Sequence, residues 1–176
     1  ITNYVTVNDC ANITLACGGS PIMADCVREV AEITTICDAL ALNIGTLSML
    51  DAMLAAGKQA NAVHHPIVLD PVAAGASRAR LEAVEQIVSQ MQLSVIRGNI
   101  SEIKTVYAGG GKSKGVDADA SDAVNERNVD DIVKMVKELS ARTGAVIAVS
   151  GETDIIADEK KAYLIRNGHQ RIAWLG

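Results

Sequence analysis

The stretch that decides the fold of this chain is Ile67-Val68-Leu69-Asp70-Pro71-Val72-Ala73-Ala74-Gly75-Ala76. Its three branched apolar residues predict a short strand buried on both faces, because an uninterrupted apolar run is typical of parallel sheets covered by helices. The strand should end at Asp70, since Pro71 cannot donate a hydrogen bond to a sheet. Asp70 then lies at the carboxyl end of a parallel strand, where open α/β sheets bind their ligands.

A second stretch predicts a neighbouring strand with the same layout: Ser94-Val95-Ile96 runs into Arg97-Gly98-Asn99-Ile100-Ser101-Glu102. The carboxyl ends of parallel strands meet at one edge of a sheet, so both stretches should face a common ligand. Carboxylates are hard ligands for Mg²⁺, and an arginine binds phosphate through two parallel hydrogen bonds. The pattern indicates a phosphate-bearing ligand, with Asp70 and Glu102 for a metal and Arg97 for the phosphate.

Polar residues at the other expected strand ends enlarge this candidate site. The whole set is Asn43, Gly45, Thr46, Asp70, Arg97, Asn99, Glu102 and Ser150. Such a set suits phosphoryl transfer, in which positioning and charge neutralisation supply most of the catalysis. Two structural interpretations stay open: each residue could cap a helix or close a turn, and Asp70 and Glu102 could pair with Arg97.

Strand and helix patterns alternate along the 176 residues, which predicts an α/β fold in a single domain over residues 1–176. Apolar runs predict strands at 39–44, 66–70, 94–97 and 145–150, followed by a hairpin of 154–157 with 161–165. Helical periodicity predicts helices at 7–17, 26–36, 47–59, 80–90 and 129–143, and a short helix from Ser101. We therefore expect a mostly parallel sheet covered by helices on both faces.

Composition argues against several classes of protein. The formal net charge of −5 argues against broad binding to nucleic acid, and no stretch approaches the roughly 18–20 apolar residues of a membrane span. The four cysteines form no CxxC pair, which argues against a zinc site or a disulfide framework. This use of cysteine predicts a cytoplasmic protein, and Ile1-Thr2-Asn3-Tyr4 contains no basic segment, so no signal peptide is visible.

Residues 109–127 differ in character from the rest of the chain. They begin with Gly109-Gly110-Gly111-Lys112, whose spacing does not match the Walker phosphate-binding pattern, and no buried strand leads into them. Their glycine, aspartate and serine content predicts a mobile surface loop.

Several motifs closely resemble those of hydroxyethylthiazole kinases, in the same order along the chain. They are Ile1-Thr2-Asn3-Tyr4-Val5-Thr6-Val7-Asn8-Asp9, Ser20-Pro21-Ile22-Met23-Ala24-Asp25, Leu42-Asn43-Ile44-Gly45-Thr46-Leu47, Leu69-Asp70-Pro71-Val72, Ile96-Arg97-Gly98-Asn99-Ile100-Ser101-Glu102 and Asn167-Gly168-His169. The resemblance implies a ribokinase-like fold with three layers, α/β/α. It also implies an Mg²⁺-dependent enzyme that passes the γ-phosphoryl group of ATP to the hydroxyl of 4-methyl-5-(2-hydroxyethyl)thiazole in thiamine salvage. Such enzymes are homotrimers with thiazole sites between subunits.

The resemblance implies roles only for positions that match the family motifs. The residues implied for the thiazole are Asn3, Met23, Gly45 and Thr46, the last two from a neighbouring subunit. The residues implied for ATP are Arg97, Asn99 and Ser150. The residues implied for Mg²⁺ are Asp70 and Glu102. Ser150 replaces the usual threonine of the family and keeps its hydroxyl.

The chain departs from the family pattern after Asn167-Gly168-His169. Family members continue into a Thr-Gly-x-Gly-Cys motif, which forms an anion hole at a helix N-terminus and carries a cysteine regarded as the base. This chain runs instead into Ile172-Ala173-Trp174-Leu175-Gly176, and none of its four cysteines matches that motif. We therefore assign no catalytic base, and we expect activity from a chain extended through the motif but not from one that ends at Gly176.

Two further functions stay open at this point. One is a related hydroxymethylpyrimidine kinase on the same fold, although the start Ile1-Thr2-Asn3-Tyr4-Val5 argues against it. The other is an inactive fragment that binds the thiazole or only assembles, which the missing motif favours.

Overall fold

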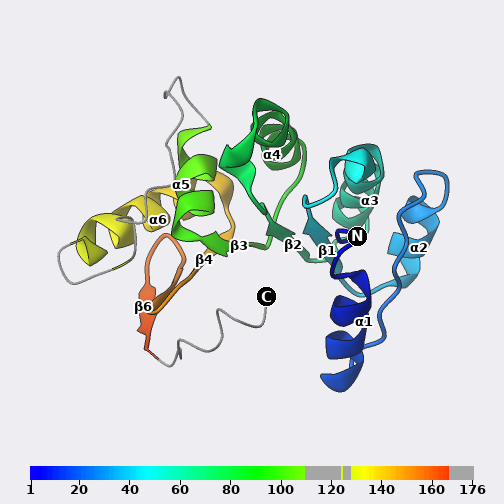
Figure 1. The fold of residues 1–176 in the computed structure, drawn as a ribbon, viewed down its shortest axis with the longest axis horizontal. Helices are drawn as coiled ribbons and strands as arrows, with labels where there is room; N and C mark the ends of the chain where they lie inside the picture. Colours follow the sequence, from blue (N-terminus) through cyan, green and yellow to red (C-terminus); the bar gives the residue numbers. More distant parts are fainter. Residues whose placement is uncertain (110–123, 125–127, 167–176) are drawn as a thin grey trace.

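The structure is a computed structural model that describes residues 1–109, 124 and 128–166 (Figure 1). In chain order its elements are α1 (Val7–Ala16), α2 (Val30–Ile36), β1 (Leu40–Asn43), η1 (Leu47–Met49), α3 (Leu50–Ala62), β2 (Ile67–Asp70), η2 (Ala74–Ala76), α4 (Arg78–Gln90), β3 (Val95–Asn99), α5 (Ile100–Ala108), α6 (Val129–Thr143), β4 (Val146–Ser150), β5 (Asp154–Ala157) and β6 (Ala162–Ile165). Most predicted elements are present, but α2 begins at Val30, four residues later than expected. The predicted loop 109–127 lies outside the described residues except for Gly109 and Val124.

The strands form one six-stranded sheet in the order β1-β2-β3-β4-β5-β6. Strands β1 to β4 are parallel, and β5 and β6 continue the sheet as an antiparallel hairpin. The expectation of a mostly parallel α/β sheet is confirmed. Its register aligns the strand ends, because Asn43 lies opposite Asp70 and Asn99 lies opposite Ser150.

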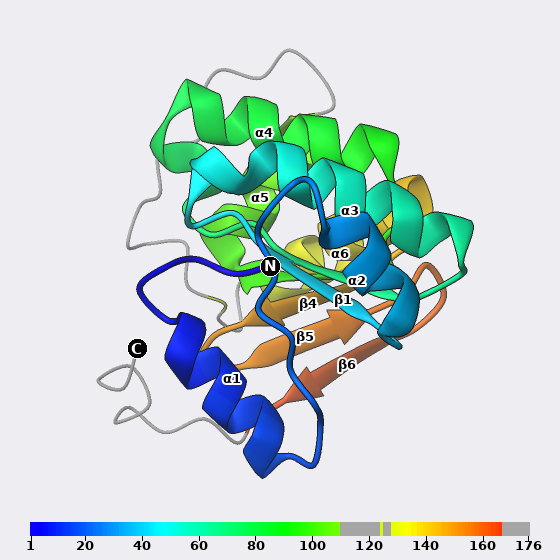
Figure 2. The same ribbon diagram turned by 90° about the vertical axis from the view of Figure 1, so that its right-hand side faces the viewer.

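Helices α3, α4 and α5 lie on one side of the sheet, and α1 lies on the other (Figure 2). Parallel strands that follow one another in chain order are joined by crossovers of one hand, which place their helices on the same face. Ile67 and Leu69 point into this helical layer and are fully buried. The intervening Val68 points to the opposite face and is 38% exposed. The expectation that β2 is buried on both faces is therefore wrong for the described part of the chain.

Helix α1 is attached to the rest of the molecule mainly through the residues that precede it. None of its own residues is buried, and Ile13 and Leu15 are more than half exposed. Ile1 pairs with β1 instead, since the Asn43 N–H donates to the carbonyl of Ile1 over 3.1 Å. None of the described helices has the length and apolarity needed to cross a membrane.

The turn from β3 into α5 has a clear local cause. Asn99 caps the helix by accepting from the Glu102 N–H, and the Glu102 carboxylate accepts in return from the Asn99 N–H. This reciprocal capping box satisfies backbone donors that a helix N-terminus otherwise leaves unpaired. It places Arg97, Asn99 and Glu102 within six residues at the carboxyl end of a central strand.

Candidate functional site at the carboxyl ends of the strands

A row of hydrogen-bonded side chains crosses the ends of the first three strands. Asp70 Oδ2 accepts from Asn43 Nδ2 over 3.2 Å and from Arg97 Nη1 over 3.4 Å. Asn43 Oδ1 accepts in turn from Asn3 Nδ2 over 3.1 Å. The Arg97 side chain is 55% exposed, so its guanidinium keeps donors available for a ligand. Asn3, Asn43, Asp70 and Arg97 therefore form one continuous polar row.

Asp70 is the electrostatic centre of this row. Partial burial raises the pKa of its carboxyl above the ordinary value, and the neighbouring Glu102 carboxylate adds to that rise. The Arg97 guanidinium and the hydrogen bond from Asn43 act in the opposite direction on the same pKa. A bound cation would favour the ionised carboxylate, so the surroundings of Asp70 suit a site that gains positive charge with its ligand.

Glu102 is held more firmly than a surface acid. Its Oε2 accepts from the Asn99 N–H over 2.8 Å, and its Oε1 accepts from the Ala73 N–H over 2.9 Å. Ala73 adopts the left-handed conformation with φ 52°, which is uncommon for a residue with a Cβ atom. Glu102 thus joins the loop after β2 to the start of α5, with both carboxylate oxygens already engaged.

The residues implied for the thiazole lie partly together. Asn43 Oδ1 also accepts from the Gly45 N–H over 2.9 Å, and Thr46 Oγ1 accepts from the Tyr4 N–H over 3.2 Å. A Cβ atom on Gly45 would lie 2.7 Å from the Cβ of Asn3, so only glycine fits here without displacement. The structure therefore brings Asn3, Gly45 and Thr46 of one chain to the β1 side of the polar row, whereas the resemblance implies Gly45 and Thr46 from a neighbouring subunit.

Three other implied residues take different positions. The Ser150 hydroxyl lies at the end of β4 and donates to the carbonyl of Gly98 over 3.3 Å. Asn99 uses its side-chain oxygen to cap α5. Met23 lies between α1 and α2, is 38% exposed, and takes no part in the polar row of the described residues.

The residues present fit an Mg²⁺ ion held chiefly by water and substrate phosphates. Among the described residues no donor reaches Oδ1 of Asp70, so that oxygen is available as a ligand. The described part of the chain contains no cluster of three or more acidic, histidine or cysteine side chains that could enclose a metal. Mg²⁺ commonly binds through one or two carboxylates and shares the substrate phosphates, which agrees with this arrangement.

Two residues of this region were not assigned a role from the sequence. The sequence pattern predicts Asn43 as a polar strand end, and the structure shows that it contacts both Asn3 and Asp70. The pattern predicts Arg80 as the start of a helix, and the structure shows that its guanidinium reaches the loops after β1 and β2. The sequence does contain an indication of this role. A positive charge in the first turn of a helix is unfavourable, which suggests that Arg80 has acceptors outside the helix.

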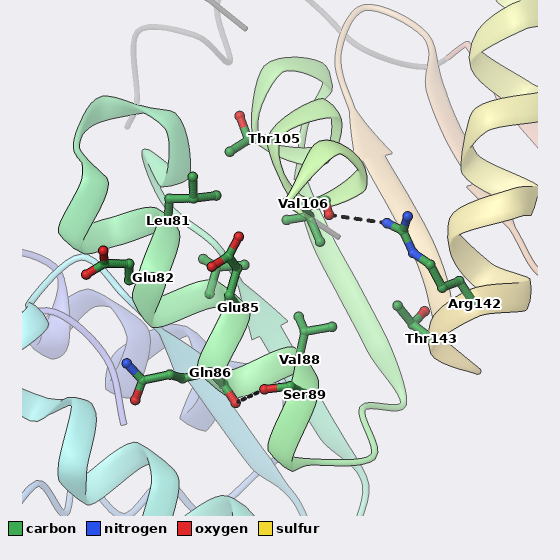
Figure 3. Close-up of a pocket in the computed structure, with 12 residues that line it drawn as sticks. Leu81, Glu82, Glu85, Gln86, Val88, Ser89, Thr105, Val106, Arg142 and Thr143 are labelled. Carbon is green, nitrogen blue, oxygen red and sulfur yellow. Dashed lines mark hydrogen bonds between the residues drawn. The ribbon is translucent and has the colours of Figure 1, made fainter. Parts of the chain in front are cut away.

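A separate pocket of about 690 Å³ opens between α4, α5 and the end of α6 (Figure 3). Its lining includes Leu81, Glu85, Val106 and Arg142. The Arg142 guanidinium donates hydrogen bonds to the carbonyls of Val106 and Tyr107. None of the residues implied for substrate or metal lines this pocket, so the candidate site remains at the strand ends.

The mostly parallel six-stranded sheet with its antiparallel hairpin is a ribokinase-like fold. The fold is shared with a putative Ribokinase II from E. coli at a TM-score of 0.52 and 12% identity, over 82% of this chain and 42% of that one. The chain belongs to the hydroxyethylthiazole kinase family, whose family model matches residues 1–175.

Two curated relatives and one solved structure illustrate this membership. The hydroxyethylthiazole kinase of Clostridium acetobutylicum is 54% identical over 98% of this chain, and that of Alkaliphilus oremlandii is 46% identical over the same share. The structure of a hydroxyethylthiazole kinase protein from Pyrococcus horikoshii OT3 superimposes with a TM-score of 0.84 at 31% identity over 99% of this chain. The chain spans 64%, 62% and 63% of these three proteins, respectively.

Proposed function

We propose that the protein carrying this chain transfers the γ-phosphoryl group of ATP to the hydroxyl of 4-methyl-5-(2-hydroxyethyl)thiazole, a step of thiamine salvage. The observation that carries the proposal is the polar row from Asn3 through Asn43 and Asp70 to Arg97. It joins a residue implied for the acceptor to a residue implied for phosphate. Family membership supports this acceptor over a hydroxymethylpyrimidine, because the relatives are named hydroxyethylthiazole kinases.

On the phosphate side, Arg97 binds the phosphate oxygens of ATP through its exposed guanidinium. Asp70, through its available oxygen, and Glu102, through its charge, would hold Mg²⁺, which would supply positive charge that neutralises the phosphates. Asn99 and the Ser150 hydroxyl complete this side at the ends of β3 and β4. These groups orient the phosphoryl group and stabilise its charge, which is the main catalytic requirement of phosphoryl transfer.

On the acceptor side, Asn3, Met23, Gly45 and Thr46 bind the thiazole. Thr46 Oγ1 is fixed by the Tyr4 N–H, and Gly45 allows the Asn3 segment to approach β1 closely. The row through Asn43 then sets the distance between the thiazole hydroxyl and the phosphate held at Arg97. Fixing two reactants in this way accounts for a large part of catalysis in bimolecular reactions.

We also propose that the protein is a cytoplasmic homotrimer whose thiazole sites lie between subunits. Support comes from the apolar side chains exposed along the N-terminal segment and α1, among them Tyr4 at 62%, Val5 at 89% and Ile13 at 62%. Exposed apolar residues gathered in one region mark an interaction site more often than a free surface. Sedimentation at micromolar concentration should give a trimer, whereas a monomer alone would contradict the assembly.

The test of the reaction is ADP release that depends on the acceptor alcohol. With Mg²⁺ and ATP, hydroxyethylthiazole should stimulate ADP release, and a hydroxymethylpyrimidine should not. Chelation of Mg²⁺ should abolish the stimulation. ADP release stimulated only by the pyrimidine would instead identify the protein as a hydroxymethylpyrimidine kinase. Thiazole binding without ADP release would support a binding function in place of catalysis.

A further inference from the structure

The guanidinium of Arg80 joins two loops that border the candidate site. Its Nη1 donates to the carbonyl of Ile44 over 3.0 Å and to that of Val72 over 3.1 Å, and its Nη2 donates to the carbonyl of Gly45 over 3.1 Å. Ile44 and Gly45 follow β1, whereas Val72 follows β2. Arg80 itself comes from the first turn of α4 and is partly buried.

The partners of Arg80 are unusual for an arginine. Among the described residues no carboxylate pairs with it, and the acceptors of its guanidinium are all backbone carbonyls. Hydrogen bonds from a charged donor are stronger than those between neutral groups, so three of them restrain both loops firmly. A lysine could not reproduce the contact, because a single ammonium is a point charge without the planar fork that spans the two loops.

These two loops carry the two halves of the proposed site. The β1 loop holds Gly45 and Thr46 on the acceptor side, and the β2 loop follows directly from Asp70 on the phosphate side. The β2 loop has a second restraint, since the Ala73 N–H donates to Glu102. The Gly45 loop is held by Asn43 from the side of the polar row and by Arg80 from the side of α4.

We infer that Arg80 is a positioning residue that holds the acceptor loop against the phosphate loop. This inference rests on the proposed function. Arg80 touches neither substrate; it acts through the backbone of Ile44, Gly45 and Val72. Its loss should displace the acceptor loop more than the phosphate loop, because the acceptor loop loses two of the three Arg80 hydrogen bonds, whereas the phosphate loop loses one and keeps the Ala73–Glu102 contact. The transfer step should suffer more than ATP binding.

The experiment compares Arg80→Ala with Arg78→Ala. Arg78 lies on the same helix two residues earlier and pairs with Glu82 at the surface, where its side chain is 91% exposed. For Arg80→Ala we expect kcat to fall by about 10²-fold, since small misplacements of a reactant have effects of that size. The KM for hydroxyethylthiazole should rise and the KM for ATP should stay within about twofold. Arg78→Ala should match the wild type in all three values.

If Arg80 only supported the fold, its substitution would lower the free energy of unfolding without changing the KM for hydroxyethylthiazole more than the KM for ATP. Equal changes in both KM values, or kinetics like those of Arg78→Ala, would overturn the inference. If Arg80→Ala folds poorly, Arg80→Lys takes its place, and it should show the same split in weaker form because it keeps the charge. An Arg80→Lys enzyme with wild-type kinetics would equally overturn the inference.

A second measurement separates this inference from the proposed function. Amide hydrogen exchange at Gly45 and Ala74 should quicken in Arg80→Ala and stay unchanged in Arg78→Ala, because both amides belong to the joined loops. If the wild type shows no thiazole-dependent ADP release, the proposed function is wrong. The role of Arg80 as a link between the loops is then tested by amide hydrogen exchange alone. Unchanged exchange in Arg80→Ala would overturn its role as a link between the loops.

Discussion

The carboxylate of Glu102 and the backbone N–H of Ala73 are joined by a hydrogen bond of 2.9 Å that connects the ends of two different strands. The other oxygen of the same carboxylate closes the capping box of α5. Ala73 keeps its left-handed backbone beside this acceptor. One side chain thus determines both the start of a helix and the path of the loop that follows Asp70.

Glu102→Ala should therefore lower the free energy of unfolding by about 2–4 kcal/mol. The variant keeps the Asn99 side-chain cap but removes the charged acceptor of the Ala73 N–H, a loss of about 1.5–3 kcal/mol, and the more exposed acceptor of the Asn99 N–H, which contributes less. Urea unfolding followed by circular dichroism measures the change. The control is Glu82→Ala, whose pair with Arg78 is exposed and should contribute less than about 1 kcal/mol. Equal losses in both variants would contradict the structural role of Glu102.

Arg97→Ala should weaken ATP binding by about 2–3 kcal/mol, the typical size of lost charge-assisted hydrogen bonds. Affinity for hydroxyethylthiazole should barely change, because the acceptor residues lie on the β1 side of the row. Calorimetric titration with each ligand measures both effects, and Arg78→Ala controls for the loss of one positive charge. A large loss of thiazole affinity with normal ATP binding would reverse the assignment of the two sides.

The stability of the protein should depend on the ionisation of Asp70 when Mg²⁺ is chelated. Burial raises the pKa of Asp70 in the folded state above its value of 3.8 in the unfolded chain. At pH values between these two pKa values, the folded protein therefore binds more protons than the unfolded chain. The free energy of unfolding, relative to that of Asp70→Asn, should therefore fall as pH rises through this window and stay level above it. Urea unfolding at a series of pH values measures the difference.

Asp158 is the natural control for this titration because its shift has the opposite sign. The N–H groups of Lys161 and Lys160 donate to its carboxylate and lower its pKa below 3.8. The free energy of unfolding, relative to that of Asp158→Asn, should rise as pH rises toward 3.8 and stay level above it. If the relative free energy of unfolding changed with pH in the same direction for both residues, burial of Asp70 would not control its ionisation.

Gly45→Ala should lower the free energy of unfolding by about 1–3 kcal/mol, the usual cost of forcing an extra methyl group into a filled space. The new Cβ would lie 2.7 Å from Asn3 Cβ and 2.9 Å from Asn43 Oδ1. Thiazole affinity should fall with it, because Asn3 must move. The matched stability control is Gly151→Ala, whose Cβ would meet its nearest neighbour at 3.6 Å. Equal unfolding free energies for wild type and Gly45→Ala would show that the Asn3 segment is free to shift.

Local sequence patterns were sufficient to predict most of the helices and strands and their order along the chain. The helix over Val129–Thr143 and the hairpin of β5 and β6 match their predicted positions closely, because periodicity and turn residues act over only a few neighbours. The proximity of the carboxyl ends of β2 and β3 was also predictable, since polar residues follow apolar strands there, and the structure brings Asp70 into contact with Arg97. The motifs that resemble the family added the expected substrates.

The contacts among these residues, and therefore which side chains form the polar row, became evident only from the tertiary structure. Asn43 and Asp70 are 27 residues apart, and Arg80 and Ile44 are 36 apart, so their contacts depend on strand order and register. The exposed face of β2 follows from crossovers that put the helices on one side, which an apolar run such as Ile67-Val68-Leu69 does not reveal. Local sequence encodes backbone preference over short distances, whereas contacts between distant segments arise only when the sheet brings strand ends together.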